Sequence, residues 1–99
     1  MRLSNEQARM IKLLAQEVAG SHARVRLFGS RLDDQAKGGD VDLLLELTDP
    51  ALNPALTAAK FSARVSRLFQ GSQVDVLISA PNLARFPIHE IAQKEGQLL

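Results

Sequence analysis

The sequence predicts one α+β domain over residues 1–99, a small mixed β-sheet with helices packed on it. Three observations support this prediction. Two long segments carry apolar residues at helical spacing, three short segments rich in Val, Leu and Ile have the length of strands, and glycine or proline stands at most of the junctions. A length of 99 residues fits a single domain with one hydrophobic core.

A first helix is expected over about residues 5–19. Ser4 and Gln7 form the pattern of a capping box, in which each side chain bonds to the backbone amide of the other residue. Gly20 is a natural stop for this helix. Between these signals, apolar residues recur at helical spacing, namely Ile11, Leu14, Ala15 and Val18.

Three strands are indicated by a different pattern. Residues 24–28 alternate charged and apolar side chains, as in a strand buried on one face. Residues 41–47 are apolar on nearly both faces, which indicates a central strand, and residues 73–78 (QVDVLI) form the third. Between the first two strands, Gly29-Ser30 ends the first one, and residues 31–39 predict a polar loop with room for one helical turn.

Two further helices follow. Asn53 and Pro54 suit the N-cap and first position of a helix that runs to about residue 69. A last helix is expected from about residue 87 to residue 96, with Ile88, Ile91 and Ala92 facing inward. The helix between strands two and three implies a right-handed crossover and parallel pairing, while the short link between strands one and two favours an antiparallel pair. The sheet should therefore have three or four strands.

Composition excludes several classes of function. A net charge of +1 supports neither a nucleic-acid nor a membrane-surface protein, and we take the basic residues Lys60, Arg64 and Arg67 to form a solvated helix face. The chain has no Cys, no Trp and no Tyr, so thiolate metal sites and aromatic platforms for single strands are not expected. With no apolar run long enough for a membrane helix and no signal-peptide pattern, we expect a cytoplasmic protein.

The main candidates for chemistry are three aspartates. Asp40 and Asp42 stand one residue apart where a central strand begins, so they point to the same side, with about 6.5–7 Å between their Cα atoms. Two carboxylates that share a partly buried site repel each other unless a cation neutralises them, and Mg²⁺ prefers such oxygen ligands. If the third strand lies beside the second, Asp75 joins them, and three carboxylates could hold two ions for phosphoryl chemistry.

The Gly29-Ser30 turn supplies a second element. Glycine allows the backbone to approach a phosphate, exposed amides cradle anions, and a serine hydroxyl adds a donor. Arg31 could neutralise the outer phosphates. Each feature alone has a simpler reading: a glycine-serine turn, a solvated strand end, an edge aspartate. Their order along one short chain favours a common site. His22 and His89 fall outside this set, and we take them to be incidental.

With these motifs, the chain resembles a minimal nucleotidyltransferase of the DNA polymerase β-like superfamily. The family signature is G-S, about nine to twelve residues, D-x-D, and a third carboxylate in a later strand. Here it reads Gly29-Ser30, nine residues, Asp40-Val41-Asp42, and then Asp75. The flanks LFGSR and GGDVDLLLE match one subgroup closely, and the resemblance covers nearly the whole chain.

The resemblance implies Mg-dependent transfer of a nucleoside monophosphate from an NTP, most simply AMP from ATP, to a hydroxyl. Asp40 and Asp42 would ligate two Mg²⁺ ions, Asp75 would ligate the catalytic one and help to activate the acceptor, and Gly29, Ser30 and Arg31 would bind the nucleotide.

Relatives of this size often pair with a HEPN-domain toxin and act as its antitoxin, some by adenylylating a tyrosine of the toxin. A HEPN partner is therefore expected. The alternative is a non-catalytic antitoxin that neutralises its partner by occlusion. The chain also ends sooner than relatives that continue into a further strand, so Leu98 and Leu99 are expected to leave an apolar edge for a homo- or hetero-oligomer.

Overall fold

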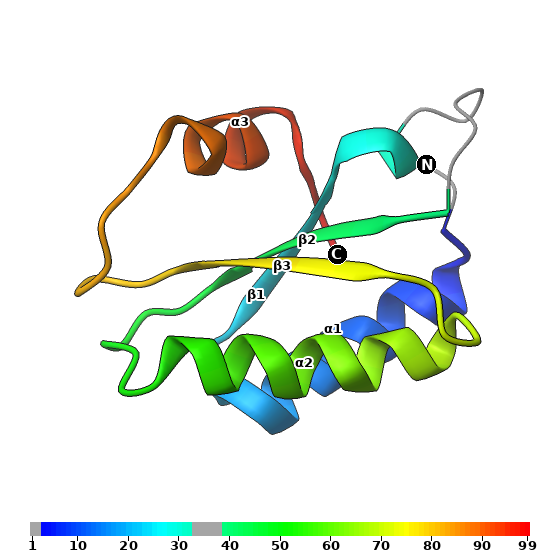
Figure 1. Ribbon diagram of the computed structural model, residues 1–99, viewed down its shortest axis with the longest axis horizontal. Coiled ribbons are helices and arrows are strands. Elements are labelled where there is room, and N and C mark those ends of the chain that lie inside the picture. Colours follow the sequence, from blue (N-terminus) through cyan, green and yellow to red (C-terminus); the bar gives the residue numbers. More distant parts are fainter. Residues whose placement is uncertain (1–2, 33–38) are drawn as a thin grey trace.

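The computed structural model describes residues 3–32 and 39–99, and within them it has the α+β architecture expected from the sequence. Helices α1 and α2 cover one face of the sheet, and α3 lies on the other (Figure 1). None of the helices in these two ranges is long and apolar enough to cross a membrane. In chain order the elements are α1 (Asn5–Ala19), β1 (Arg24–Phe28), the 3-10 helix η1 (Gly29–Leu32), β2 (Val41–Glu46), α2 (Pro54–Leu68), β3 (Val74–Ser79), α3 (Pro87–Glu95) and β4 (Gln97–Leu98).

The sheet has the order β3-β2-β1-β4. Strand β2 is parallel to β3 and antiparallel to β1, as the connection lengths predict. It is the central strand of the prediction, and its Val41, Leu43, Leu44 and Leu45 are fully buried. Every second residue of β2 therefore points toward α1 and α2, and the residues between them point toward α3.

Local sequence signals determine where α1 and α2 begin. Ser4 and Gln7 form the expected capping box, each backbone amide donating to the other side chain at 3.0 Å. At α2, the amide of Leu56 donates to Asn53 Oδ1 at 3.2 Å, and Pro54 occupies the first turn. These bonds satisfy amides that have no partner within the helix, which is why both helices begin where the sequence predicts.

The core lies between the sheet and these two helices. From the sheet it takes Val25 and Leu27 of β1 and alternate residues of β2. From the helices it takes Ile11 and Ala15 of α1 and Phe61 and Val65 of α2, with Phe69 just after the end of α2. The amphipathic spacing of both helices thus places their apolar sides on the sheet.

The inward face of α3 differs from the prediction. Ile88 and Ile91 are 42% and 47% exposed, whereas His89 and Ala92 are buried. The His89 ring determines this orientation: its Nδ1 accepts the Phe86 amide, and its Nε2 donates to the carbonyl of Ile78, both at 3.1 Å. His89 is therefore a structural residue of the α3 N-terminus, and not an incidental one.

Strand β4 corrects the expectation for the end of the chain. Gln97 and Leu98 pair antiparallel with β1, and the Leu99 amide donates to the Val25 carbonyl at 2.9 Å. Gly96 makes this return possible, because a Cβ there would lie 2.2 Å from the Ala92 carbonyl oxygen. Leu99 packs against the core, while Leu98 remains 47% exposed.

Candidate functional site

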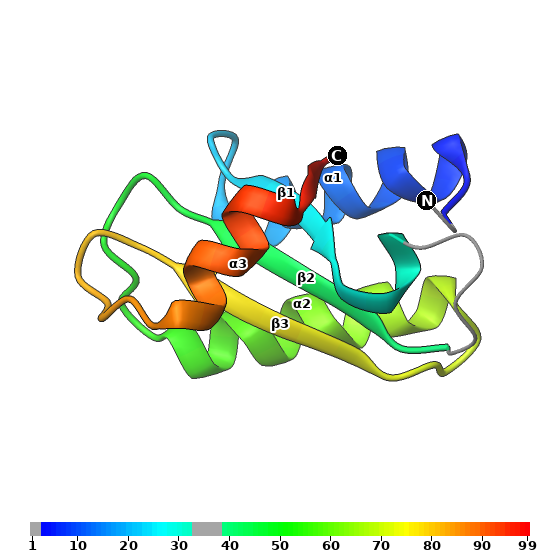
Figure 2. The ribbon, with the colours of Figure 1, turned by 90° about the horizontal axis from the view of Figure 1, so that it is seen from above.

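The site predicted from the sequence lies where β2 and β3 begin, beside η1. Figure 2 shows η1 at this end of the sheet, with α3 displaced toward the other end. In the pairing of β1 with β2, Phe28 is opposite Asp42, so the chain turns at Gly29 directly next to the Asp42 side chain. Residues 33–38, which include Gly38, lie outside the described ranges, as does the side chain of Ser30.

Gly29 is required at this turn for two separate reasons. Its φ of +77° is in the left-handed region, which side chains with a Cβ rarely adopt. In addition, a Cβ at Gly29 would lie 2.4 Å from Asp42 Oδ2 and 3.1 Å from Asp42 Cγ. The absence of a side chain at residue 29 therefore makes room for the Asp42 carboxylate.

Asp42 and Asp75 are direct neighbours across the parallel pair β2–β3. Residues opposite each other in register point to the same face of a sheet, so the two carboxylates share the face that carries α3. Asp42 is half-buried and Asp75 is exposed. This register confirms the expectation that Asp75 lies on the same face as Asp42.

The electrostatics of Asp42 reflect this crowding. Burial raises the pKa of the Asp42 carboxyl above its ordinary value of 3.8, and the nearby charges of Asp75 and Asp40 raise it further. Asp40 itself is exposed and stands just before β2. Asp40 and Asp75 therefore both act on Asp42, and a cation beside the Asp42 carboxylate would relieve this repulsion.

Gln73 is a member of this neighbourhood that sequence reasoning missed. Its Nε2 donates to both carboxylate oxygens of Asp75, at 3.2 Å to Oδ1 and 3.4 Å to Oδ2. The signal was present in the sequence: residues 73 and 75 are two apart in an extended segment, so their side chains lie on one side. Gln73 is a donor that can hold the Asp75 side chain in place.

Arg31, the third residue predicted to bind the nucleotide, contacts two groups of the protein itself. Its guanidinium lies over the Phe69 ring at 4.9 Å from the ring centroid, and its Nη2 donates to the Gly39 carbonyl at 3.1 Å. Arg31 thus ties the end of η1 to the residue that precedes Asp40. In this arrangement it positions the backbone beside the aspartates.

The carboxylates have the donor chemistry that Mg²⁺ prefers. They do not form a complete metal site as they stand, because within residues 3–32 and 39–99 no three His, Cys, Asp or Glu side chains are gathered closely enough to hold an ion. The Asp75 carboxylate also accepts from Gln73 and keeps lone pairs that a metal could use. The three aspartates thus have the negative charge and the oxygen ligands that suit Mg²⁺.

Neither a scan against protein-family models nor a search of curated proteins returns a match to this chain.

Proposed function

We propose that this chain is a cytoplasmic, Mg-dependent nucleotidyltransferase that transfers AMP from ATP to a hydroxyl of a partner protein. The observation that carries the proposal is the placement of Asp42 beside Asp75 in register, against a glycine that leaves room for the carboxylate. Asp40 adds a third negative charge that acts on Asp42. The G-S turn and the D-x-D pair of the family resemblance thus lie next to each other in space.

Each residue has a stated role in the proposed reaction. The acceptor oxygen attacks the α-phosphorus of ATP, the bond from that phosphorus to the bridging oxygen of pyrophosphate breaks, and the hydroxyl proton passes to an Asp75 carboxylate oxygen. Asp40 and Asp42 would hold the metal together with Asp75. The metal would supply the positive charge that offsets the phosphates and the carboxylates.

The turn at residue 29 supports the part of the proposal that concerns nucleotide binding. Without a Cβ, Gly29 leaves its backbone open to a close approach by phosphate oxygens, and Ser30 would add its amide and hydroxyl. Arg31 bonds to Gly39 in this structure, so we assign it to positioning the segment that leads to Asp40.

The acceptor we propose is a hydroxyl of a HEPN-domain toxin, which the chain would silence as an antitoxin. A tyrosine acceptor would have to belong to another protein, because this sequence contains no Tyr. The proposal of this partner depends on the family resemblance.

A transfer assay tests the reaction. This chain is incubated with ATP labelled on the α-phosphate, Mg²⁺ and the proposed HEPN-domain partner, and the expected products are a labelled partner and free pyrophosphate. Asp42→Asn should lower the rate about 100-fold or more, because it removes a charge placed at the reacting phosphate. Glu17→Gln is the matched control, since it removes an exposed carboxylate of α1 with only a 3.5 Å contact to Arg64. Absence of both transfer and Mg-dependent ATP binding in the unaltered protein would contradict the proposal.

A second candidate function is a non-catalytic antitoxin that binds its partner by occlusion. The observation that favours it is the apolar outer side of α3, where Phe86, Ile88 and Ile91 are 60%, 42% and 47% exposed. Exposed apolar side chains grouped on one short segment are typical of interaction surfaces.

Two variants separate the candidates. Asp40→Ala combined with Asp42→Ala removes the carboxylates and leaves α3 intact, whereas Ile88→Ser combined with Ile91→Ser alters α3 alone. If occlusion carries the function, neutralisation of the toxin in cells survives the first pair and fails with the second. If transfer carries it, the first pair abolishes neutralisation.

A further inference from the structure

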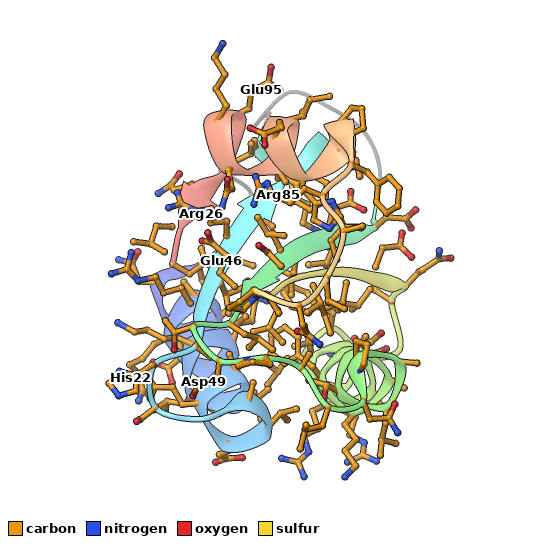
Figure 3. All side chains as sticks on the ribbon, turned by 90° about the vertical axis from the view of Figure 1, so that its left-hand side faces the viewer. His22, Arg26, Glu46, Asp49, Arg85 and Glu95 are labelled. Carbon is orange, nitrogen blue, oxygen red and sulfur yellow. The ribbon has the colours of Figure 1, made fainter. Side chains whose placement is uncertain are left out.

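A surface hollow of about 710 Å³ lies at the end of the sheet opposite the aspartates. Figure 3 looks onto this end, with His22 at one side and Glu46 near the middle. Residues of five elements and their connecting turns line it, among them Lys12, His22, Arg24, Thr48, Ser79 and Gln93. We call it the basic hollow.

Three basic side chains of the basic hollow have no partner among the residues that the structure describes. The side chains of Lys12, His22 and Arg24 make no hydrogen bond or ion pair within the described ranges 3–32 and 39–99. Other basic residues nearby are engaged: Arg26 pairs with Glu46 at 2.6 Å, and Arg85 with Glu90 at 2.9 Å. The hollow therefore presents hydrogen-bond donors and positive charge that the protein itself does not use.

The carboxylate that lines the hollow contributes little opposing charge. Glu46 Oε1 accepts from Arg26 Nε at 2.6 Å, and Glu46 Oε2 accepts from Gln93 Nε2 at 2.8 Å. Gln93 is held in turn by Arg85 Nη2 at 2.6 Å from its Oε1. These hydrogen bonds hold the side chains of Glu46 and Gln93 in place on one side of the basic hollow. Asp49 lines a smaller adjoining hollow of about 260 Å³, which also includes His22, and no hydrogen bond or ion pair of its side chain within the described ranges offsets its repulsion of an anion.

The basic hollow is separate from the aspartate site. Asp42 and Glu46 are four residues apart on β2, which is about 13 Å in an extended strand. That distance exceeds the screening length of about 8–10 Å at ordinary salt. The hollow stands instead at the carboxyl ends of the parallel strands β2 and β3, where open α/β sheets commonly bind ligands.

We propose that the basic hollow binds a small phosphomonoester. Arginine and lysine are the side chains that recognise phosphate best, Arg24 by its planar fork and Lys12 as a point charge. The hydroxyls of Thr48 and Ser79 add neutral donors to the lining of the same hollow. A volume of about 710 Å³ lies within the range of small-molecule sites, so the hollow has room for the body of a sugar phosphate or a mononucleotide.

The test is a titration of the full chain in low salt without Mg²⁺, monitored by amide NMR. Inorganic phosphate, ribose 5-phosphate and AMP are the three probes, and they distinguish phosphate alone from a sugar or a nucleoside carrier. At least one should bind saturably at millimolar concentration and shift amides around Ser21, Thr48 and Ser79. Lys12→Ala combined with Arg24→Ala should weaken that binding at least about tenfold, since charged hydrogen bonds are lost.

The matched control is Lys60→Ala combined with Arg67→Ala. It removes the same charge from exposed positions of α2, so it should leave binding within about twofold if local contacts, and not net charge, hold the ligand. Equal weakening by both pairs, or no saturable binding of any probe, overturns the proposal. Binding should persist in Asp42→Asn, so failure of the transfer reaction does not affect this result.

Discussion

Gly29→Ala tests the closest contact of the candidate site. The substitution forces a Cβ into a backbone with φ of +77°, which costs about 1–2 kcal/mol, partly offset by about 0.4–1 kcal/mol from a stiffer unfolded chain. The new Cβ would also lie 2.4 Å from Asp42 Oδ2, and relieving such crowding costs about 1–3 kcal/mol. The free energy of unfolding should therefore fall by about 1.5–4 kcal/mol.

Gly71→Ala provides the control. Gly71 has a similar φ of +89°, but a Cβ there meets nothing within 4 Å. It should lose only the backbone part, about 0.5–1 kcal/mol. Urea denaturation monitored by far-UV circular dichroism is the suitable assay, because the chain has neither Trp nor Tyr for fluorescence.

A double-mutant cycle isolates the contact with Asp42. Asp42→Ala removes the two nearest atoms and leaves Cβ, which would be 3.3 Å from the new methyl group. In that background, Gly29→Ala should cost at least about 1 kcal/mol less than in the unaltered protein, because only the 3.3 Å contact to Cβ remains. If Gly29→Ala costs the same in both backgrounds, the carboxylate does not lie against Gly29, and the site we describe is wrong.

Three further predictions concern single side chains. Folding raises the pKa of Asp42 above 3.8. Between 3.8 and that higher pKa, the folded protein keeps a proton on Asp42 that the unfolded chain releases. The free energy of unfolding therefore falls as the pH rises from 3.8 through the pKa of the folded state. Asp42→Asn should therefore melt above the unaltered protein at pH 7 and lose this advantage below pH 3.8, as measured by circular dichroism over a pH series. His89→Ala should lose about 1–3 kcal/mol in urea denaturation, while the exposed His22→Ala changes stability by less than about 0.5 kcal/mol; equal effects would contradict the role of His89. Asp49→Asn should tighten phosphomonoester binding to the basic hollow in the NMR titration, and weaker binding would count against the assignment of charges there.

The elements that sequence analysis predicts well are those determined by nearby residues. Helix α1 spans Asn5–Ala19 as expected, because the capping bonds of Ser4 and Gln7 and the stop at Gly20 are all local. The sequence predicts the bounds of α3 correctly, but it does not predict which side of the helix faces the sheet. A helix of nine residues has too few apolar positions to define one side, and the bond from His89 to the Ile78 carbonyl, eleven residues away, decides the face.

Strand β4 could not be predicted for a related reason. Two residues are too few to show an alternating pattern, so the strand forms only because Gly96 lets the chain return along β1. The partial burial of Leu99 against the core depends on the same return. It is a consequence of tertiary structure and leaves no local trace in the sequence.

In the candidate site, too, some features could be predicted from the sequence and others could not. The proximity of Asp42 and Asp75 could be predicted, because a crossover helix implies a parallel pair and both residues follow the start of their strands. The position of Arg31 could not. Its partners are the Phe69 ring and the Gly39 carbonyl, and a cation–π contact between residues 38 positions apart has no sequence pattern.

The backbone hydrogen bonds of β3 determine whether a strand of another chain can pair with this edge of the sheet. The amides of Val41 and Leu47 donate to the carbonyls of Gln73 and Ser79. In a parallel pair, alternate residues face the neighbouring strand. Residues 73, 75, 77 and 79 therefore bond to β2, and the carbonyls of residues 74, 76 and 78 point away from the sheet.

Side chains already occupy two of these outward carbonyls. Ser62 Oγ donates to Val74 at 2.8 Å, and His89 Nε2 donates to Ile78 at 3.1 Å. An added strand would have to break both bonds, which is one way in which natural sheets protect an exposed edge. At the other edge, β4 offers a strand of only two residues. The protein partner that we propose is therefore not expected to extend the sheet, and the exposed side chains of α3 are an alternative place for the contact.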